Sequence, residues 1–271
     1  MERIAPAAWA PRLVPLLGVV QIAFVLVWSA VWITIALALL ILTWSPEVPL
    51  ALARRVWAPG LCRFALADVR REPLPDLDWS RPYVFAMNHQ SFFDIVIAFA
   101  TIPQNLRFVA KHSLKYTPFL GWYMWATGMI FVDRSDRESA IESLADAGRH
   151  IRAGASILVY PEGTRARDRR IQPFKKGPFV VALEAGVPIV PIAVEGTAGI
   201  MPPGAVTLRP GSVRVKVGEP IPTAGLTEAD RDTLMHRVRE AMIALHRDIG
   251  GPGCDAADAT PAPDPAASSR W

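Results

Sequence analysis

The stretch PYVFAMNHQSFFD, residues 82–94, carries the strongest structural signal in the sequence. Its first six residues form a short apolar run, which is typical of a buried strand. Ser91 then stands where it can cap a helix that begins at Phe92. The stretch therefore predicts a strand, a turn and a helix, which is the repeating unit of an α/β sheet.

His89 and Asp94 lie five positions apart across this turn. In a continuous helix, five steps of about 100° would point the two side chains roughly 140° apart. If the helix begins only at Phe92, His89 lies in the incoming loop and can fold back toward Asp94. The helix N-terminus keeps that carboxylate ionised, so it can orient the imidazole as a base. An isolated histidine at such a junction is more often a turn residue, and the paired Asp94 is what favours catalysis.

Further strand-like runs alternate with helical ones along the chain. Together with PYVFAM they are LRFVA (106–110), GMIFVD (128–133), SILVY (156–160) and VPIVPIAVE (187–195). This alternation predicts an α/β fold with a mostly parallel central sheet flanked by helices. The stretch AVTLRPGSVRVKVGEP (205–220) predicts two more short strands in an antiparallel hairpin.

Three helices have clear end signals. Ser135 and Glu138 form a capping box for the first, and the second runs from Pro178 to Gly186. Thr227 opens a final amphipathic helix, whose inward face is predicted to hold Leu234, Val238, Met242 and Leu245.

The segment from Leu13 to Pro46 contains no charged residue. As one helix it would run roughly 50 Å, beyond the bilayer core of about 30 Å. It is therefore a tilted span that continues along the interface, a helix broken at Pro15 and Gly18, or a hairpin within the membrane. A signal peptide fits less well, because its apolar region is shorter and ends at a small-residue cleavage site.

Positive charge follows the apolar segment, and the net charge of the chain is +4. By the positive-inside rule this places the main domain on the cytoplasmic face, although the same side chains fit a merely solvated surface. These arginines are Arg54, Arg55, Arg63, Arg70 and Arg71.

Four regions follow from these patterns. Residues 1–47 form a membrane helix or helical hairpin, 48–80 an interfacial helix and linker, and 81–250 the α/β domain. Residues 251–271, rich in Pro, Ala, Gly and Asp, are predicted to be a disordered tail. The two cysteines, Cys62 and Cys254, are expected to be reduced.

A basic stretch, VYPEGTRARDRRIQPFKKG (159–177), follows the fourth predicted strand. Arg165 is nearest the strand end and best placed for a bidentate phosphate contact. The other cations are expected to supply only surface charge or to lie on lipid headgroups; they are Arg167, Arg169, Arg170, Lys175 and Lys176. Glu162 is expected to accept hydrogen bonds from an arginine or a hydroxyl rather than act as a second base.

No enzyme nucleophile is evident. The sequence has no GxSxG elbow, Cys62 lies in the interfacial region, and helix capping explains Ser91 more simply than nucleophilic attack does. No metal is expected, since the remaining histidines lack HExxH spacing and clustered carboxylates; they are His112, His150, His236 and His246.

Four blocks together identify a resemblance: NHQSFFD (88–94), GMIFVDR (128–134), YPEGTR (160–165) and VPIVPIAV (187–194). In content and order they resemble the glycerolipid acyltransferase family, most closely its bacterial-type membrane 1-acylglycerol-3-phosphate acyltransferases. The likeness extends over residues 82 to about 220. It departs from the family pattern at Tyr160, where phenylalanine is more usual, and at Val132, where isoleucine is.

The resemblance implies transfer of a fatty acyl group from acyl-CoA or acyl carrier protein to the sn-2 hydroxyl of lysophosphatidic acid, which forms phosphatidic acid. His89 and Asp94 match the family's catalytic positions. The positions that match acceptor binding are Arg134, Glu162, Gly163, Thr164 and Arg165, with Lys111 as a contact to the acceptor phosphate. The fourth block resembles a strand and pocket wall near the acyl chain.

The expected partners are membrane lipids, the lysophospholipid acceptor and the thioester donor, with no nucleic acid. The expected location is the cytoplasmic face of a bacterial-type inner membrane, and no cofactor beyond the donor is implied. Three alternatives stay open: another acceptor such as a lyso-ornithine lipid, hydrolysis of a lysophospholipid with His89 acting on water, and lipid binding without catalysis.

Overall fold

The computed structural model describes residues 10–133, 137–205 and 207–254. Its helical elements are α1 (Ala10–Thr43), α2 (Glu47–Leu52), η1 (Ala53–Trp57), α3 (Ala58–Phe64), α4 (Phe93–Thr101), η2 (His112–Tyr116), α5 (Leu120–Ala126), α6 (Arg137–Arg152), α7 (Gly177–Ala185), α8 (Thr197–Ile200), η3 (Glu228–Asp230) and α9 (Arg231–Asp248). Its strands are β1 (Ala67–Arg71), β2 (Val84–Met87), β3 (Leu106–Lys111), β4 (Ile130–Val132), β5 (Ser156–Val159), β6 (Ile189–Glu195) and β7 (Gly211–Val217).

The strands form one sheet in the order β1-β7-β6-β2-β5-β3-β4. Neighbouring strands pair in parallel, except for the antiparallel pair of β6 and β7. The expected fold class, a mostly parallel sheet flanked by helices, is confirmed. Each of the five predicted strand runs overlaps one of the strands from β2 to β6, and β3 extends one residue beyond its run, to Lys111.

The hairpin expected at 205–220 is wrong. Only β7 forms there; it pairs with β6 and with β1, and the described residues 207–210 contain no strand. The sequence ADVRR of β1 is short, polar and partly exposed, as an edge strand can be, and carried no recognisable strand signal. This strand precedes residue 81, so the sheet extends into the region 48–80.

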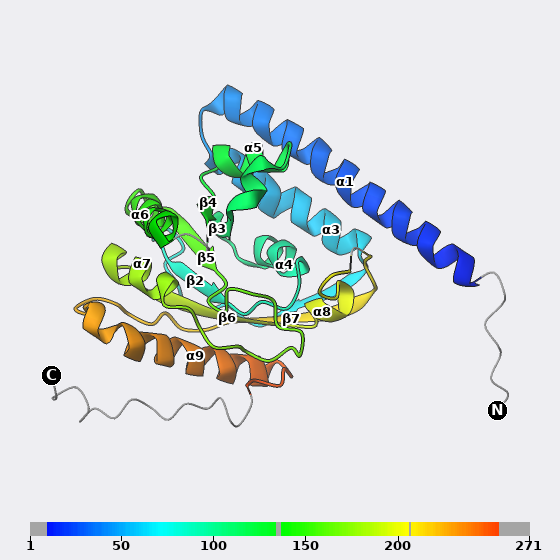
Figure 1. Cartoon of the computed structure of the whole chain (residues 1–271). Coiled ribbons are helices and arrows are strands. Elements are labelled where there is room, and N and C mark those ends of the chain that lie inside the picture. The colour runs from blue at the N-terminus through cyan, green and yellow to red at the C-terminus, as the bar shows by residue number, and fades with distance from the viewer. Residues whose placement is uncertain (1–9, 134–136, 206, 255–271) are drawn as a thin grey trace, which may run out of the picture.

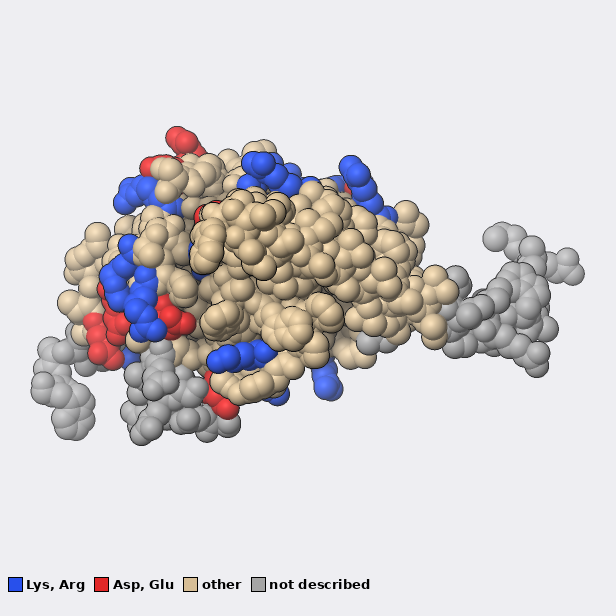
Figure 2. Space-filling view, turned by 90° about the horizontal axis from the view of Figure 1, so that it is seen from above, with Lys and Arg blue, Asp and Glu red and all other residues tan. Residues whose placement is uncertain are grey.

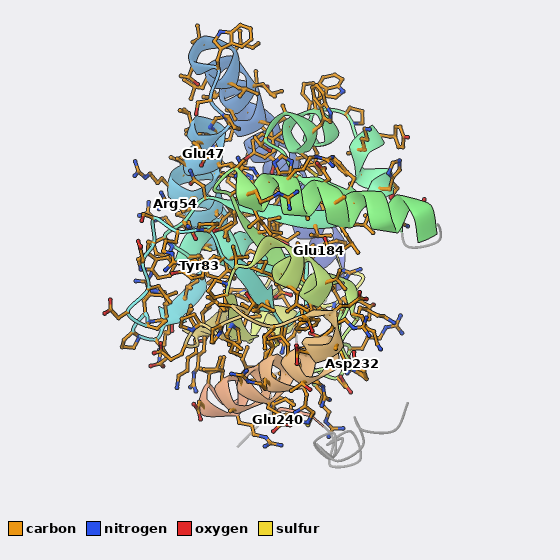
Figure 3. The ribbon with its side chains drawn as sticks, turned by 90° about the vertical axis from the view of Figure 1, so that its left-hand side faces the viewer. Glu47, Arg54, Tyr83, Glu184, Asp232 and Glu240 are labelled. Atoms are coloured by element: carbon orange, nitrogen blue, oxygen red, sulfur yellow. The ribbon has the colours of Figure 1, made fainter. Side chains whose placement is uncertain are left out.

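Both faces of the sheet are covered. All residues of β2 are buried: Val84 and Ala86 pack in one apolar cluster, whereas Phe85 and Met87 pack in the other. Helices α6, α7 and α9 cover the first face, and α3, α4 and α5 lie on the second with α1 beyond them (Figure 1). Figure 3 views the α6, α7 and α9 layer from the side, with the exposed Asp232 and Glu240 on the outer surface of α9.

The helix signals correspond to observed helices. Helix α7 has a proline in its first turn and ends at Ala185; the capping residue that follows is Gly186, whose φ of 64° suits glycine. Thr227 caps η3 through a capping box with Asp230, and α9 follows with Leu234, Val238 and Met242 buried. Helix α6 begins at Arg137, and Ser135 lies outside the described residues.

The apolar N-terminal segment is one unbroken helix, α1, which excludes two of the three alternatives that the sequence left open, a break near Pro15 and Gly18 and a turn within the segment. The chain reverses at 44–46, and α2, η1 and α3 return alongside α1. Trp28 Nε1 donates to the Trp57 carbonyl at 3.1 Å, and Phe24 stacks on Phe64. The hairpin is therefore formed by α1 with the helices that follow it. The stretch Gly18–Thr43 is long and apolar enough to cross a bilayer.

Candidate active site

The parallel strands β2, β5, β3 and β4 end at the same edge of the sheet. His89 follows β2, Glu162 and Arg165 follow β5, and Lys111 is the last residue of β3. The carboxyl edge of an α/β sheet is where such folds bind ligands, because the loops that leave it converge there. Arg134, expected after β4, lies outside the described residues.

His89 and Asp94 meet directly. His89 Nδ1 lies 2.7 Å from Asp94 Oδ2, and the imidazole is 14% exposed whereas Asp94 is fully buried. The carboxylate oxygen therefore accepts a hydrogen bond from Nδ1–H, which leaves Nε2 as the basic nitrogen of the neutral ring. Among the described residues, Nε2 has no hydrogen-bond partner. The geometry suits a general base.

The start of α4 holds Asp94 in place. Its Oδ2 also accepts the main-chain N–H groups of Gln90 at 2.7 Å and Ser91 at 2.8 Å. Ser91 Oγ accepts from the Phe93 amide and donates to the Met201 carbonyl. The helix begins one residue later than predicted, at Phe93. With both functions of its hydroxyl in use, Ser91 serves as a capping residue.

Tyr160 fixes the plane of the imidazole. Its ring stacks on His89, and the Tyr160 hydroxyl is buried without a hydrogen-bond partner among the described residues. Burial and the neighbouring Asp94 raise the pKa of this phenol well above its usual value. Tyr160 is therefore neutral and contacts His89 through the face of its aromatic ring. The sequence marked this position only as a departure from the family pattern.

Glu162 lies behind the catalytic turn and is 2% exposed. Its Oε1 accepts the His89 main-chain N–H at 2.8 Å, and its Oε2 accepts that of Gln172 at 3.0 Å. The expected arginine or hydroxyl partner is wrong; both partners are amides. Burial raises the pKa of Glu162 to about 8, against the effect of these two hydrogen bonds. Ala166 N donates to the His89 carbonyl at 2.8 Å, so the loop after β5 contacts both the main-chain N–H and the main-chain carbonyl of His89.

Arg165 contacts the catalytic turn through Phe92. Its guanidinium carbon lies 3.8 Å from the centre of the Phe92 ring, and its Nη1 is buried without a partner among the described residues. Gly163 has a φ of 71°, which lets the chain turn sharply before the exposed Thr164. A guanidinium held against the catalytic turn can present its planar set of donors to a phosphate.

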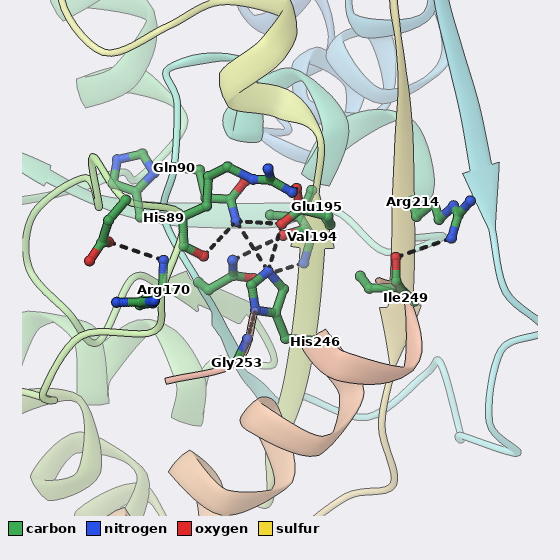
Figure 4. A network of polar contacts seen from close by, with 12 residues as sticks. His89, Gln90, Arg170, Val194, Glu195, Arg214, His246, Ile249 and Gly253 are labelled. Atoms are coloured by element: carbon green, nitrogen blue, oxygen red, sulfur yellow. Dashed lines mark hydrogen bonds and ion pairs between the residues drawn. The ribbon is translucent and has the colours of Figure 1, made fainter. Parts of the chain in front are cut away.

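Arg169 and Lys176, two of the other cations of this stretch, contact acidic side chains. Arg169 Nε donates to Glu195 Oε1 at 2.8 Å, and its Nη2 contacts the same oxygen. Lys176 Nζ lies 3.1 Å from Asp232 Oδ2 on α9. These two side chains therefore bind other elements of the fold. Figure 4 shows Glu195 within a polar network next to the catalytic turn.

Two other predicted site regions, Lys111 and the fourth block, do not contact the dyad in the described part of the chain. Lys111 is exposed at the end of β3, with no contact to the dyad among the described residues. Strand β6, from the fourth block, is buried along its whole length and pairs with β2. It supports the site as a core strand. Within the described ranges, no group of three or more His, Cys, Asp or Glu side chains is placed to hold a metal ion.

The chain has relatives of known family. The family profile named Acyltransferase matches residues 67–195, which include both parts of the site. The 1-acyl-sn-glycerol-3-phosphate acyltransferase of Saccharomyces cerevisiae is 36% identical over 173 residues, 63% of this chain and 57% of the yeast protein. The human beta form of the enzyme is 35% identical over 181 residues, 66% of this chain and 63% of the human protein. The chain thus spans less than two thirds of each relative.

A solved structure has the same fold. The crystal structure of the 1-acyl-sn-glycerophosphate acyltransferase PlsC from Thermotoga maritima superposes with a TM-score of 0.75 at 24% identity, and covers 87% of this chain and 95% of that one. This likeness shows that the two chains share a fold over most of their lengths. Residues 67–195 therefore form a domain of the acyltransferase family.

Proposed function

We propose that the protein is a 1-acylglycerol-3-phosphate acyltransferase, which transfers a fatty acyl group from acyl-CoA or acyl carrier protein to the sn-2 hydroxyl of lysophosphatidic acid. The observation that carries this proposal is the 2.7 Å contact of His89 Nδ1 with the buried Asp94, which leaves Nε2 free of partners among the described residues. The names of the yeast and human relatives support the same chemistry.

In the proposed reaction, His89 Nε2 removes the proton from the acceptor hydroxyl as its oxygen attacks the thioester carbonyl. Asp94 stabilises the imidazolium that forms. The tetrahedral intermediate then collapses, the carbon–sulfur bond breaks, and the thiolate takes the proton from His89. The products are the diacyl phospholipid and the free thiol. The enzyme forms no acyl intermediate, which agrees with the capping role of Ser91.

We assign the acceptor phosphate to Arg165, because its guanidinium has an unused donor and lies next to the catalytic turn. A planar guanidinium can bind two phosphate oxygens at once. Gly163 and Thr164 shape the same loop, and Lys111 and Arg134 remain candidates for a second phosphate contact. Glu162 supports the turn through its amide contacts rather than by binding the acceptor.

The apolar surface suits a protein seated at a membrane. Figure 2 looks onto the side of α1 and shows a broad uncharged surface, with Lys and Arg side chains mainly at its margins. Exposed side chains of α1 and α5 that contribute to it include Leu26, Val27, Ile41, Leu42, Trp122 and Trp125. Acyl chains favour the bilayer by about 0.8 kcal/mol for each buried methylene, so an enzyme at the interface avoids extracting them. We place it on the cytoplasmic face of a bacterial-type inner membrane.

One experiment tests the function. The purified full chain in detergent or vesicles is incubated with lysophosphatidic acid and a mixture of acyl-CoA and acyl carrier protein thioesters, and the lipids are identified by mass spectrometry. The expected product is phosphatidic acid. Free fatty acid alone would indicate a hydrolase, and product only from lyso-ornithine lipid would indicate another acceptor. Lysolipid binding without any product would indicate a non-catalytic binding protein.

A further inference from the structure

Gln90 directly follows the catalytic histidine and has a fully buried side chain. Its main-chain N–H donates to Asp94, as described above. Its side-chain amide Nε2 reaches in another direction, to Glu195 Oε2 at 3.0 Å and to the Arg169 carbonyl at 3.3 Å. One residue therefore joins the dyad to two segments that are far away in the sequence (Figure 4).

Glu195, at the end of β6, is the acceptor that these donors share. Its Oε2 also lies 2.8 Å from Nε2 of His246 on α9, and its Oε1 accepts from Arg169. Burial alone would raise the pKa of this carboxyl, but hydrogen bonds from His246, Gln90 and Arg169 lower it below its ordinary value. An ionised Glu195 thus satisfies donors from three other elements.

His246 is fully buried and its hydrogen bonds indicate one tautomer. Gly253 N donates to Nδ1 at 3.3 Å, so Nε2 carries a proton and donates it in a hydrogen bond to Glu195. Gln90 Nε2 lies 3.1 Å from the same ring nitrogen, but both atoms are then donors, so this is a packing contact and not a hydrogen bond. The chain after α9 passes so close that a Cβ at Gly251 would lie 2.2 Å from the imidazole. The position of His246 is therefore fixed from both sides.

We propose that Gln90, Glu195 and His246 are positioning residues, which hold the peptide of the catalytic turn so that Asp94 and His89 keep their alignment. Arg169 connects the loop that carries Arg165 to the same carboxylate. We name these four side chains the Gln90 cluster. Catalytic groups need placement within about 0.5 Å, and supporting hydrogen bonds of this kind provide it.

The inference rests on the proposed acyl transfer, and the test is a double-mutant cycle in the full-length protein. Gln90→Ala and Glu195→Ala are each expected to lower kcat by about ten- to a hundredfold, with the KM for the thioester donor changed less than about threefold. The kcat of the double variant is expected to be no lower than that of the slower single variant, because the two residues act through one contact. Losses that multiply would overturn the proposal.

A matched control is Asp248→Asn, which removes a different ion pair of α9, that of Asp248 with Lys216 at 2.8 Å. It has no contact with Gln90 among the described residues, and kcat is expected to stay within about twofold of the original value. An equal loss of kcat in this variant would indicate a general effect of α9 and overturn the proposal.

A second measurement does not depend on activity. Hydrogen exchange of the peptide that contains residues 88–94 is followed by mass spectrometry in the original protein and in Gln90→Ala. Exchange is expected to rise at least about tenfold in this peptide, while peptides from β3 keep their rates. Unchanged exchange would overturn the positioning role even if the substrate were another lipid. Absence of acyl transfer in the original protein would contradict the proposed function alone.

Discussion

The imidazole of His89 lies against the phenol ring of Tyr160, with ring centroids 4.0 Å apart and an angle of 19° between the ring planes. Asp94 holds one edge of the same imidazole through Nδ1. Two contacts therefore define the base: the carboxylate sets its tautomer, and the phenol sets its plane. Stacking with a neutral ring adds this restraint without adding a charge next to the reacting proton.

Replacing Tyr160 with phenylalanine is expected to leave kcat within about twofold of the original value. The Tyr160 hydroxyl is buried and has no partner among the described residues, so its removal costs no hydrogen bond and is neutral or stabilising. Tyr160→Ala, which removes the ring, is the matched comparison and should lower kcat at least about tenfold. Steady-state kinetics and thermal melting of both variants check this; a large loss in Tyr160→Phe would reveal a catalytic hydroxyl.

His89→Ala is expected to lower kcat by about a hundred- to ten-thousandfold, the usual contribution of general base catalysis. The fold should survive, because the imidazole makes one side-chain hydrogen bond among the described residues and lies at the partly exposed edge of the site. Turnover and the melting curve are measured on the same sample. A well-folded variant with full activity would exclude His89 as the base.

Arg165→Ala is expected to raise the KM for lysophosphatidic acid about tenfold or more and to leave the KM for the thioester unchanged, because the guanidinium is assigned to the acceptor phosphate. Arg167→Ala, an exposed cation two positions away, is the control and should change neither constant by more than about twofold. The comparison is repeated with monoacylglycerol, which lacks the phosphate. If Arg165→Ala raised the KM for both acceptors equally, the assignment of Arg165 to the phosphate would be wrong.

Local patterns were sufficient for much of the fold and for the central pair of the site. Strands β2 to β6 were predicted from short apolar runs. Strands β2, β5 and β6 are buried along their whole length, and β3 and β4 are buried in part, so apolar residues are needed on both faces of most of these strands. The spacing of His89 and Asp94 predicted their contact, since a helix start fixes where the first turn points its side chains. Edge strand β1 and the true partners of β7 were missed, because pairing at a sheet edge depends on distant segments.

The hydrogen bonds that hold the catalytic turn could not be predicted from local sequence patterns. Gln90 meets Glu195 and His246 across 105 and 156 positions of sequence, and no spacing rule connects them. His246 was considered only as a metal ligand, and Glu195 only as the end of a strand. The partners of Glu162 are main-chain amides, which every sequence supplies and which therefore leave no signal.

The raised pKa of Glu162 also makes the stability of the protein depend on pH. Burial raises its pKa from 4.5 to about 8 in the folded protein. Between those two values the folded state keeps a proton that the unfolded chain has lost. Unfolding then releases this proton, so the free energy of unfolding that Glu162 contributes falls as pH rises from about 4.5 to about 8. Above pH 8 the contribution is constant.

Glu162→Gln removes this titration and serves to isolate it. The variant still fills the space, but its amide nitrogen must face one of the two N–H groups that now donate to the carboxyl, which costs about 1–3 kcal/mol. The Tm of the original protein should exceed that of the variant by the widest margin near pH 5, and the margin should narrow toward pH 8. Melting curves of both proteins at half-unit steps of pH measure the margin. A constant margin across this range would mean that Glu162 is ionised throughout, and that the two main-chain amides outweigh its burial.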